Sequence, residues 1–198
     1  MSVLHNYKVC FLGRTGNGKS TLINALYGTT FNTDPLISCT KELYTVTLMN
    51  NCPEDYDSIT IYDTPGIGEF STNERYRLFY EEAISESDCI VLVSTFDRTD
   101  APAQRLLLNL RPLMKGNPRF IIALNHIDSS IIAADERYVP WNHEANIPTK
   151  ECLQFIQQRT DILTARFSDI LNISAIIPVC GIYDYGIKDL KQCITNNK

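Results

Sequence analysis

The segment from Gly13 to Ser20, Gly-Arg-Thr-Gly-Asn-Gly-Lys-Ser, restricts the possible fold more than any other part of the sequence. It fits the pattern G-x-x-x-x-G-K-[ST] and lies between an apolar run ending at Leu12 and a helical pattern beginning at Thr21. In such a strand, loop and helix unit, the glycines let successive backbone N–H groups point at phosphate oxygens, and the helix N-terminus adds its positive dipole end. The motif therefore predicts a phosphate-binding loop at the end of a strand.

The motif also assigns roles to individual side chains. Lys19 is expected to place its charge on the β- and γ-phosphate oxygens of a nucleotide, and Ser20 to offer its hydroxyl to Mg²⁺. A Gly-rich turn with an incidental Lys-Ser pair is the plain alternative, but the flanking patterns argue against it. The predicted nucleotide contacts in this segment are Arg14, Thr15, Gly16, Asn17, Gly18, Lys19, Ser20 and Thr21.

Short β-rich runs alternate with helical patterns along the whole chain, which is typical of a mostly parallel sheet covered by helices on both faces. With 198 residues, 44% of them hydrophobic, the chain has enough material for one core. We therefore expect a single domain over residues 1–198, of the α/β class, with a doubly wound sheet. The six predicted strands are Tyr7–Leu12, Leu43–Met49, Ser58–Tyr62, Cys89–Ser94, Phe120–Leu124 and Ser174–Val179.

Apolar residues at helical spacing predict five helices between these strands. These residues are Leu22, Ile23 and Leu26; Tyr76, Phe79, Tyr80, Ala83 and Ile84; Leu106, Leu107, Leu110 and Met114; Leu153, Ile156, Leu163 and Phe167; and Ile187, Leu190 and Ile194. A turn at residues 50–57 should join the second and third strands as an antiparallel hairpin. Residues 129–148 form a long, insertion-like loop around Trp141, which is expected either to carry a function or to plug the core.

The four residues Asp63-Thr64-Pro65-Gly66 follow the third strand, at the edge of the sheet where parallel α/β proteins place their ligands. Asp63 is predicted to hold a water molecule of the Mg²⁺ shell. The backbone N–H of Gly66 is predicted to contact the γ-phosphate, so that residues 67–74 would respond to its removal.

A second motif, Asn125-His126-Ile127-Asp128, closes the fifth predicted strand. The ordered motifs GRTGNGKS, Thr40, DTPG and NHID resemble those of the translation-factor-related P-loop GTPases, particularly the Era-like branch, over essentially the whole chain. The resemblance implies a P-loop G domain that binds GTP and GDP. In that family the aspartate of N-x-x-D accepts two hydrogen bonds that guanine donates and adenine cannot, so Asp128 would select guanine, with Asn125 beside it.

The same resemblance places two further elements. The Mg²⁺-binding threonine of the family falls on Thr40, with Ser38 or Thr33 as alternatives, so the expected metal-binding residues are Ser20, Thr40 and Asp63. The loop after the last strand falls on Cys180 and Gly181, whose N–H groups would face the guanine O6.

One position departs from the family pattern. The family usually has lysine where this sequence has His126, and the lysine stem packs over the base and ties its loop to the P-loop. Histidine can stack but does not tether as far. We therefore expect the nucleotide site to form with weakened affinity, with His126 still among its residues.

The residue after Gly66 is Ile67, where Ras-like relatives carry the glutamine that orients the attacking water. An aliphatic side chain cannot orient water, so slow intrinsic turnover is predicted. The chemistry would then depend on a preorganised phosphate site, in which Lys19, Thr40 and Gly66 are the expected catalytic residues. Further help could come from Glu69, Glu74, Arg14 or a second protomer, and the sequence does not choose among them.

We interpret the chain as a molecular switch whose GTP state is read by a protein effector or a ribosomal subunit. The alternatives are a dimerising scaffold GTPase domain like those of septins and dynamins, or a pseudo-GTPase. A P-loop ATPase or small-molecule kinase would leave Asn125 and Asp128 unexplained.

The bulk properties exclude several other classes. The net charge of −5 gives no general attraction to nucleic acid. The seven cysteines are scattered without a CxxC pair, which argues against a structural metal and suits a reducing compartment. No signal peptide or run of 18 apolar residues is present, so we expect no transmembrane segment and a cytoplasmic location.

Overall fold

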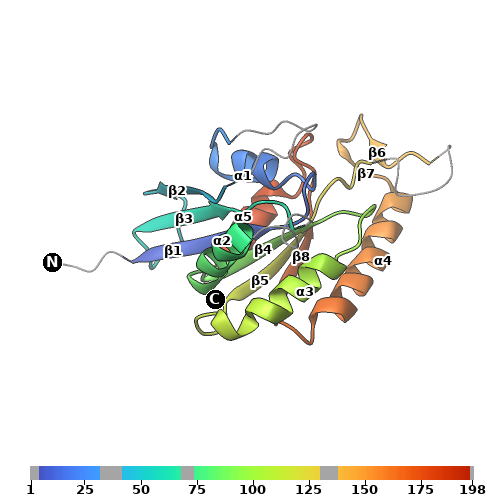
Figure 1. Cartoon of the computed structure of the whole chain (residues 1–198). Coiled ribbons are helices and arrows are strands. Elements are labelled where there is room, and N and C mark those ends of the chain that lie inside the picture. The colour runs from blue at the N-terminus through green and yellow to red at the C-terminus, as the bar shows by residue number, and fades with distance from the viewer. Residues whose placement is uncertain (1–4, 32–41, 68–73, 130–137, 197–198) are drawn as a thin grey trace.

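The computed structural model describes residues 5–31, 42–67, 74–129 and 138–196. Its main element is a six-stranded sheet in the order β2-β3-β1-β4-β5-β8 (Figure 1). The strands are β1 (Asn6–Leu12), β2 (Tyr44–Leu48), β3 (Ser58–Asp63), β4 (Cys89–Ser94), β5 (Arg119–Leu124) and β8 (Ile173–Pro178). Strand β2 pairs antiparallel with β3, and the other neighbouring pairs in this sheet are parallel. The predicted α/β class, the six strands of this sheet and the antiparallel pairing of its second and third strands are confirmed.

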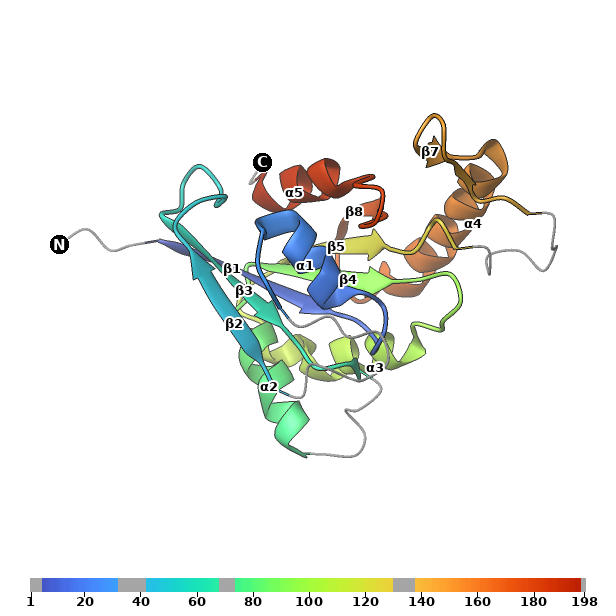
Figure 2. The same cartoon turned by 90° about the horizontal axis from the view of Figure 1, so that it is seen from above.

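Helices cover both faces of the sheet, as Figure 2 shows from above. Helices α1 (Lys19–Tyr27) and α5 (Ile187–Thr195) lie on one face, and their Leu22 and Leu190 belong to one core cluster. Helices α2 (Glu74–Ser85), α3 (Ala101–Leu110) and α4 (Lys150–Phe167) cover the other face, where they form a second cluster. The five predicted helices are confirmed.

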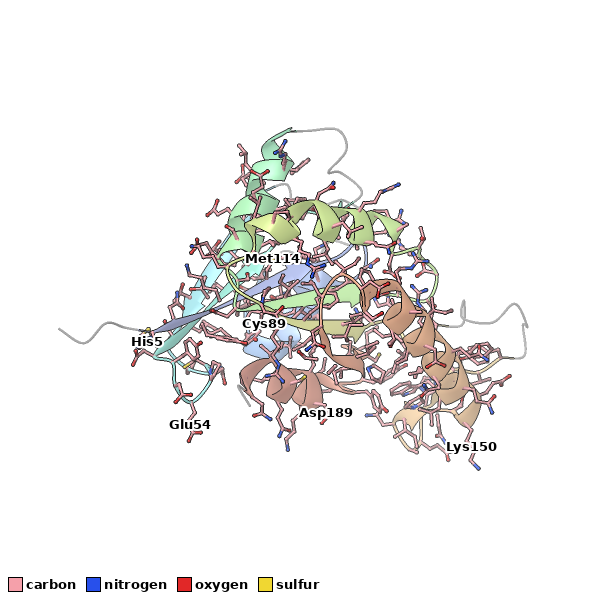
Figure 3. All side chains as sticks on the ribbon, turned by 90° about the horizontal axis from the view of Figure 1, so that it is seen from below. His5, Glu54, Cys89, Met114, Lys150 and Asp189 are labelled. Carbon is pink, nitrogen blue, oxygen red and sulfur yellow. The ribbon has the colours of Figure 1, made fainter. Side chains whose placement is uncertain are left out.

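Strand β1 shows why the central strands are apolar throughout. Val9 and Phe11 belong to the cluster under α1 and α5, whereas Cys10 and Leu12 belong to the cluster under α2, α3 and α4. Because successive side chains of a strand point to opposite faces, a strand covered on both faces must be apolar at nearly every position. In Figure 3 the label Cys89, at the start of β4, marks this interior between the helical layers.

Two elements differ from the sequence prediction. Helix α3 ends at Leu110 and is followed by the short 3-10 helix η2 (Arg111–Leu113), so Met114 lies beyond the helix. Pro112 explains the change, because proline provides no backbone N–H for continued α-helical hydrogen bonding. The predicted loop 129–148 contains strands β6 (Trp141–Asn142) and β7 (Ile147–Pro148), which pair antiparallel, while its residues 130–137 lie outside the described ranges.

A membrane-spanning helix is not found in the described part of the chain: none of its helices is sufficiently long and apolar.

Candidate nucleotide-binding site

The loop 13–18 connects β1 to α1 in the conformation that its glycines allow. Gly16 and Gly18 have φ angles of 80° and 83°, which side-chain-bearing residues rarely adopt. A Cβ atom on Gly13 would lie 2.6 Å from the Val93 carbonyl oxygen, so the loop packs directly against β4. The backbone N–H of Asn17 donates to the Arg14 carbonyl at 3.1 Å and closes the turn. Backbone sterics therefore fix this loop.

Two buried side chains, one at the start of α1 and one in the loop, hold this turn in place. Lys19 is 6% exposed, and its Nζ donates to the Gly13 carbonyl at 3.2 Å. Asn17 is also buried, and its Nδ2 donates to the Val93 carbonyl at 2.8 Å. The lysine charge is thus held inside the turn, at the N-terminal end of α1, where positive potential from backbone N–H groups also concentrates.

Ser20 and Asp63 bring a hydroxyl and a carboxylate together beside this loop. Ser20 Oγ donates to Asp63 Oδ2 at 2.5 Å, and Asp63 is 0% exposed at the end of β3. Thr64 secures this strand end, since its Oγ1 donates to the Phe11 carbonyl at 2.8 Å. Oxygen donors of this kind fit Mg²⁺, which is commonly bound by one or two protein groups together with phosphate oxygens and water.

The third predicted metal-binding residue, Thr40, lies outside the described residues, as do its alternatives Ser38 and Thr33. In the described ranges, no three His, Cys, Asp or Glu side chains are grouped so that they could hold a metal ion. The described oxygen donors Ser20 and Asp63 therefore suit a shared protein and phosphate site rather than an all-protein cage.

Gly66 lies in direct contact with the P-loop. A Cβ atom at this position would be 1.8 Å from Thr15 Oγ1 and 2.6 Å from the Thr15 nitrogen, so only glycine fits. The next residue, Ile67, donates its N–H to the Gly13 carbonyl at 3.2 Å, and its side chain is 3% exposed in the core. The Tyr80 hydroxyl donates to the Pro65 carbonyl at 2.5 Å and anchors the same turn to α2.

Asn125 joins the second motif to the P-loop. Its Nδ2 donates to the Asn17 carbonyl at 3.0 Å, and its own N–H donates to the Ser94 carbonyl at 2.8 Å. The following residue, His126, has a φ of 58° and is exposed, yet its Nε2 lies 3.2 Å from where a Cβ on Gly18 would be. His126 therefore lies against the P-loop, but the hydrogen bond between the two loops comes from Asn125.

The imidazole of His126 is only partly removed from water, and desolvation still lowers its pKa from the ordinary value. Asp128 acts in the opposite direction, because its negative charge favours the protonated ring.

The remaining residues predicted to contact the base, Asp128, Cys180 and Gly181, lie close together near the first turn of α1. Burial, together with the neighbouring Asp128 carboxylate, raises the pKa of the Cys180 thiol to about 11. A Cβ on Gly181 would lie 4.0 Å from Thr21 Cγ2, so the loop after β8 faces the first turn of α1. Cys180 and Tyr185 exchange two backbone hydrogen bonds of 3.0 and 3.1 Å, which close this loop.

Residues 8–126 match the family model described as 50S ribosome-binding GTPase. The chain belongs to this family. The matched range contains the P-loop, the Asp63 to Gly66 turn and Asn125, and it stops before Asp128 and the loop after β8. Membership makes the chain a GTP-binding P-loop G domain, of a family that generally hydrolyses GTP.

Solved structures of other GTPases share the fold. Era, in complex with MgGDPNP and nucleotides of 16S ribosomal RNA, is 19% identical with a TM-score of 0.66, over 98% of this chain and 57% of that one. A dimerization-deficient mutant of Toc33 from Arabidopsis thaliana is 16% identical with a TM-score of 0.64, over 98% of this chain and 86% of that one. The GDP-bound Roco2 RocCORdC of Methanosarcina barkeri is 19% identical with a TM-score of 0.58, over 96% and 48%.

At these identities the likeness shows the fold alone, and matches to Era, Toc33 and Roco2 together do not single out the Era-like branch. This G domain spans about half of the Era and Roco2 chains that it matches. No curated protein matches the chain significantly.

The structure adds one residue to the phosphate side of this G domain that the sequence analysis missed. Arg98 Nη1 donates to the Thr15 carbonyl, and the guanidinium lies 3.2 Å from where a Cβ on Gly16 would be. The polar run Asp97-Arg98-Thr99-Asp100, separated by two residues from the end of β4, is the signal that could have indicated it, since ligands bind at the carboxyl ends of such strands.

Arg159 of α4 supports this segment from behind. Its Nη2 donates to Asp100 Oδ2 at 2.5 Å and to the carbonyls of Thr95 and Arg98, each at 3.0 Å. Burial raises the pKa of Asp100, and the Arg159 charge opposes that shift. A largely buried ion pair thus fixes the backbone from which Arg98 reaches the P-loop.

Proposed function

We propose that this chain binds GTP and GDP with Mg²⁺, hydrolyses GTP to GDP and phosphate with slow intrinsic turnover, and acts as a molecular switch. One observation carries the proposal: the side-chain amide of Asn125 donates to the backbone carbonyl of Asn17 at 3.0 Å and brings the N-x-x-D loop against the P-loop. A phosphate-binding turn and a base-selecting carboxylate, Asp128, would then serve one nucleotide.

On the phosphate side, the N–H groups of residues 14–20 and the Lys19 ammonium would bind the β- and γ-phosphates. Ser20 and Asp63 would hold Mg²⁺ directly or through water, and the ion would offset phosphate charge. Gly66, fitted against Thr15, would present its N–H to the γ-phosphate. Thr40 would complete the metal site, and the linkage of Gly66 to the P-loop would let residues 67–74 respond to hydrolysis.

Slow GTP hydrolysis is expected because the residue after Gly66 is Ile67. Ile67 has no polar group, and its side chain is buried in the core rather than turned toward the phosphate loop. The catalytic contribution of the protein would then be electrostatic, from Lys19, Gly66 and Thr40, without a side chain that orients water at this position.

The test is the displacement of a fluorescent GDP analogue by GTP and by ATP, with Mg²⁺, on the wild type and on Asp128→Asn. GTP should displace the analogue and ATP should not. Asp128→Asn should lower the GDP affinity by about 10- to 100-fold, because losing one partner of a buried, charged hydrogen bond costs about 1–3 kcal/mol of binding free energy. Asp184→Asn, on an exposed residue of the nearby loop, is the matched control.

The Asp128→Asn variant should also gain affinity for xanthosine diphosphate. Xanthine carries an oxygen acceptor where guanine carries its 2-amino donor, and the asparagine amide can donate to it. Equal displacement by ATP and GTP, or an Asp128→Asn variant that binds GDP as well as the wild type does, would refute guanine selection.

For the partner of the GTP state we propose a ribosomal subunit or a protein effector, in the cytoplasm. The description of the matching family favours the ribosome, and the similar Era structure contains ribosomal RNA. Co-sedimentation with isolated subunits, in the presence of GDP or of a non-hydrolysable GTP analogue, tests this. Binding that requires the analogue supports a ribosomal switch, and no binding in either state removes the ribosome from the proposal.

A dimerising scaffold domain is the second candidate. The observation that favours it is the similarity to Toc33, whose crystallised mutant is described as dimerization-deficient and of which this chain covers 86%. Light scattering of the GDP and GTP-analogue complexes separates the two candidates, because a scaffold of this kind should dimerise in one nucleotide state.

A further inference from the structure

The β6–β7 hairpin and the start of α4 touch both loops that carry the proposed base contacts. We propose that they form a brace, consisting of Trp141, Asn146 and Cys152, that positions these loops and so determines guanine selectivity. This inference rests on the proposed function and extends it from the base contacts to the residues behind them. Figure 1 shows the hairpin beside the first turns of α4, and Figure 3 marks that end of α4 with Lys150.

Trp141 fixes the loop after β8. It is 2% exposed, its ring stacks on Tyr183 with centroids 4.7 Å apart and planes at 14°, and Tyr185 packs edge-on against it at 5.5 Å. Both tyrosines lie in the loop that begins with Cys180 and Gly181. Flat aromatic contacts of this kind restrict how the loop can lie, because stacked rings cannot tilt without losing contact.

The tip of the hairpin adds polar contacts to the same loop. Asn146 Nδ2 donates to the Tyr183 carbonyl at 3.2 Å, and the Tyr183 hydroxyl lies 3.4 Å from His143 Nδ1. Hairpin side chains therefore hold Tyr183 by its ring, its backbone and its hydroxyl.

The other end of the brace holds the N-x-x-D loop. The buried Cys152 thiol donates to the Ile127 carbonyl at 3.2 Å, between His126 and Asp128. The cap of α4 links this contact to the hairpin, since Thr149 Oγ1 donates to the Val139 carbonyl at 2.9 Å and accepts from the Cys152 N–H at 3.3 Å.

These contacts reach the base side without touching the phosphate side. The loops they support carry Asp128 and Cys180, which face each other. On the phosphate side, Lys19 donates to the Gly13 carbonyl, and Ser20 donates to Asp63 at the end of β3. Loosening the brace should therefore change recognition of the base and leave recognition of phosphate in place.

The experiment compares binding of GDP, inosine diphosphate and pyrophosphate, each with Mg²⁺, by calorimetry. Inosine diphosphate lacks the 2-amino group that Asp128 would bind, so the ratio of the GDP and inosine diphosphate affinities measures base selection. Trp141→Ala should lower the GDP affinity about tenfold and the ratio of the GDP and inosine diphosphate affinities about fivefold. Its pyrophosphate affinity should stay within about twofold of the wild-type value. Trp141→Phe, which keeps a flat ring, should restore most of the ratio.

Two further variants guard against a merely structural effect. Phe167→Leu removes a buried contact with Phe120 on the same core face, away from the base loops, and should leave the ratio unchanged. Asn146→Gly removes the exposed hydrogen bond to Tyr183, and glycine accepts the φ of 54° at this position. This variant should lower the ratio two- to threefold, which keeps the test available if Trp141→Ala does not fold.

Trp141 is also the single tryptophan of the chain, so its emission reports on the brace directly. GDP should change the emission of the wild type and pyrophosphate should not. Equal losses of GDP and pyrophosphate affinity in Trp141→Ala, or an unchanged ratio in Trp141→Ala or Asn146→Gly, would overturn the brace alone. A wild type without preference for GDP over ADP would overturn the proposed function and the brace together.

Discussion

The phosphate half and the base half of the candidate site are held in different ways. In the phosphate half, the loops after β1 and β3 pack backbone against backbone, so closely that a Cβ on Gly66 would lie 2.6 Å from the Thr15 backbone nitrogen. In the base half, the loops after β5 and β8 rest on side chains of a hairpin and a helix, chiefly Trp141 and Cys152. The first arrangement leaves a short motif in the sequence, and the second depends on residues that are far apart along the chain.

The largest effect is expected from Arg159, a side chain distant in sequence that supports the segment from which Arg98 reaches the P-loop. This segment is an exception to the division, because it belongs to the phosphate half and still depends on a distant side chain. Arg159→Met leaves Asp100 buried without its charged partner, and removing one member of a buried pair costs about 3–5 kcal/mol. We expect a loss near the lower end of that range in urea unfolding, since Ser94 still donates to Asp100 at 2.9 Å.

The pH dependence checks the origin of that loss. Burial raises the pKa of Asp100 in the folded protein, so protonation at low pH relieves the buried charge, and the cost of Arg159→Met should be smaller at pH 4.5 than at pH 7. The double variant with Asp100→Asn should recover part of the stability. A loss that is independent of pH and not recovered would mean that Arg159 contributes through packing rather than charge.

Lys19→Met should have the next largest effect, confined to the phosphate half. Hydrogen bonds to charged groups contribute about 1.5–3 kcal/mol, so the affinities for GDP and for pyrophosphate should both fall by about 10- to 100-fold. Calorimetry with both ligands measures this, and Lys115→Met, which changes an exposed lysine, is the control. A variant that lost GDP affinity and kept pyrophosphate affinity would contradict the division between the halves.

The same small change made in each half sharpens the comparison. Gly66→Ala forces a Cβ into the Thr15 backbone and should cost about 1–3 kcal/mol of unfolding free energy, with weaker binding of a GTP analogue. Gly181→Ala meets only Thr21 Cγ2 at 4.0 Å and should stay within about 0.5 kcal/mol of the wild type. Thermal unfolding compares the two, and equal losses would show that the halves are packed alike.

The smallest effect is expected at the junction of the halves. His126→Lys restores the residue usual in the resembling family, and a lysine that reaches both base and P-loop should raise GDP affinity about fivefold, or roughly 1 kcal/mol. Competition with the fluorescent GDP analogue measures it, with pyrophosphate as the ligand that should not respond. Unchanged GDP affinity would indicate that Asn125 already provides the full link.

The sequence allowed the sheet and most of the phosphate half to be predicted. The six strands of the sheet agree with prediction within one residue at each end. The buried strands β4 and β5 are continuous apolar runs between polar breaks, whereas the exposed edge strand β2 alternates threonine with apolar residues. Helix α3 was predicted too long because Met114 continues its apolar spacing past Pro112. The placement of Ser20 beside Asp63 followed from two motifs that each end a strand, and the role of Thr40 stays a prediction.

The supporting residues could not be predicted for a physical reason. Arg159 lies 61 positions from the Arg98 carbonyl that it binds, and Cys152 lies 25 positions from Ile127, so neither spacing forms a local pattern. The hairpin strands hold two residues each, too few for an alternating signal. Trp141 was recognised as unusual, but only the fold brings it onto Tyr183.

Helix α1 begins at Lys19 after Gly18, with no side chain capping it and no acidic residue in its first turn. A bound diphosphate would complete that helix end, so nucleotide binding and folding are linked equilibria. A ligand that binds only the folded chain adds about 2.7 kcal/mol of stability at 100 times its Kd. Resistance to proteases, and with it the lifetime of the chain in a cell, would therefore rise and fall with the guanine nucleotide supply.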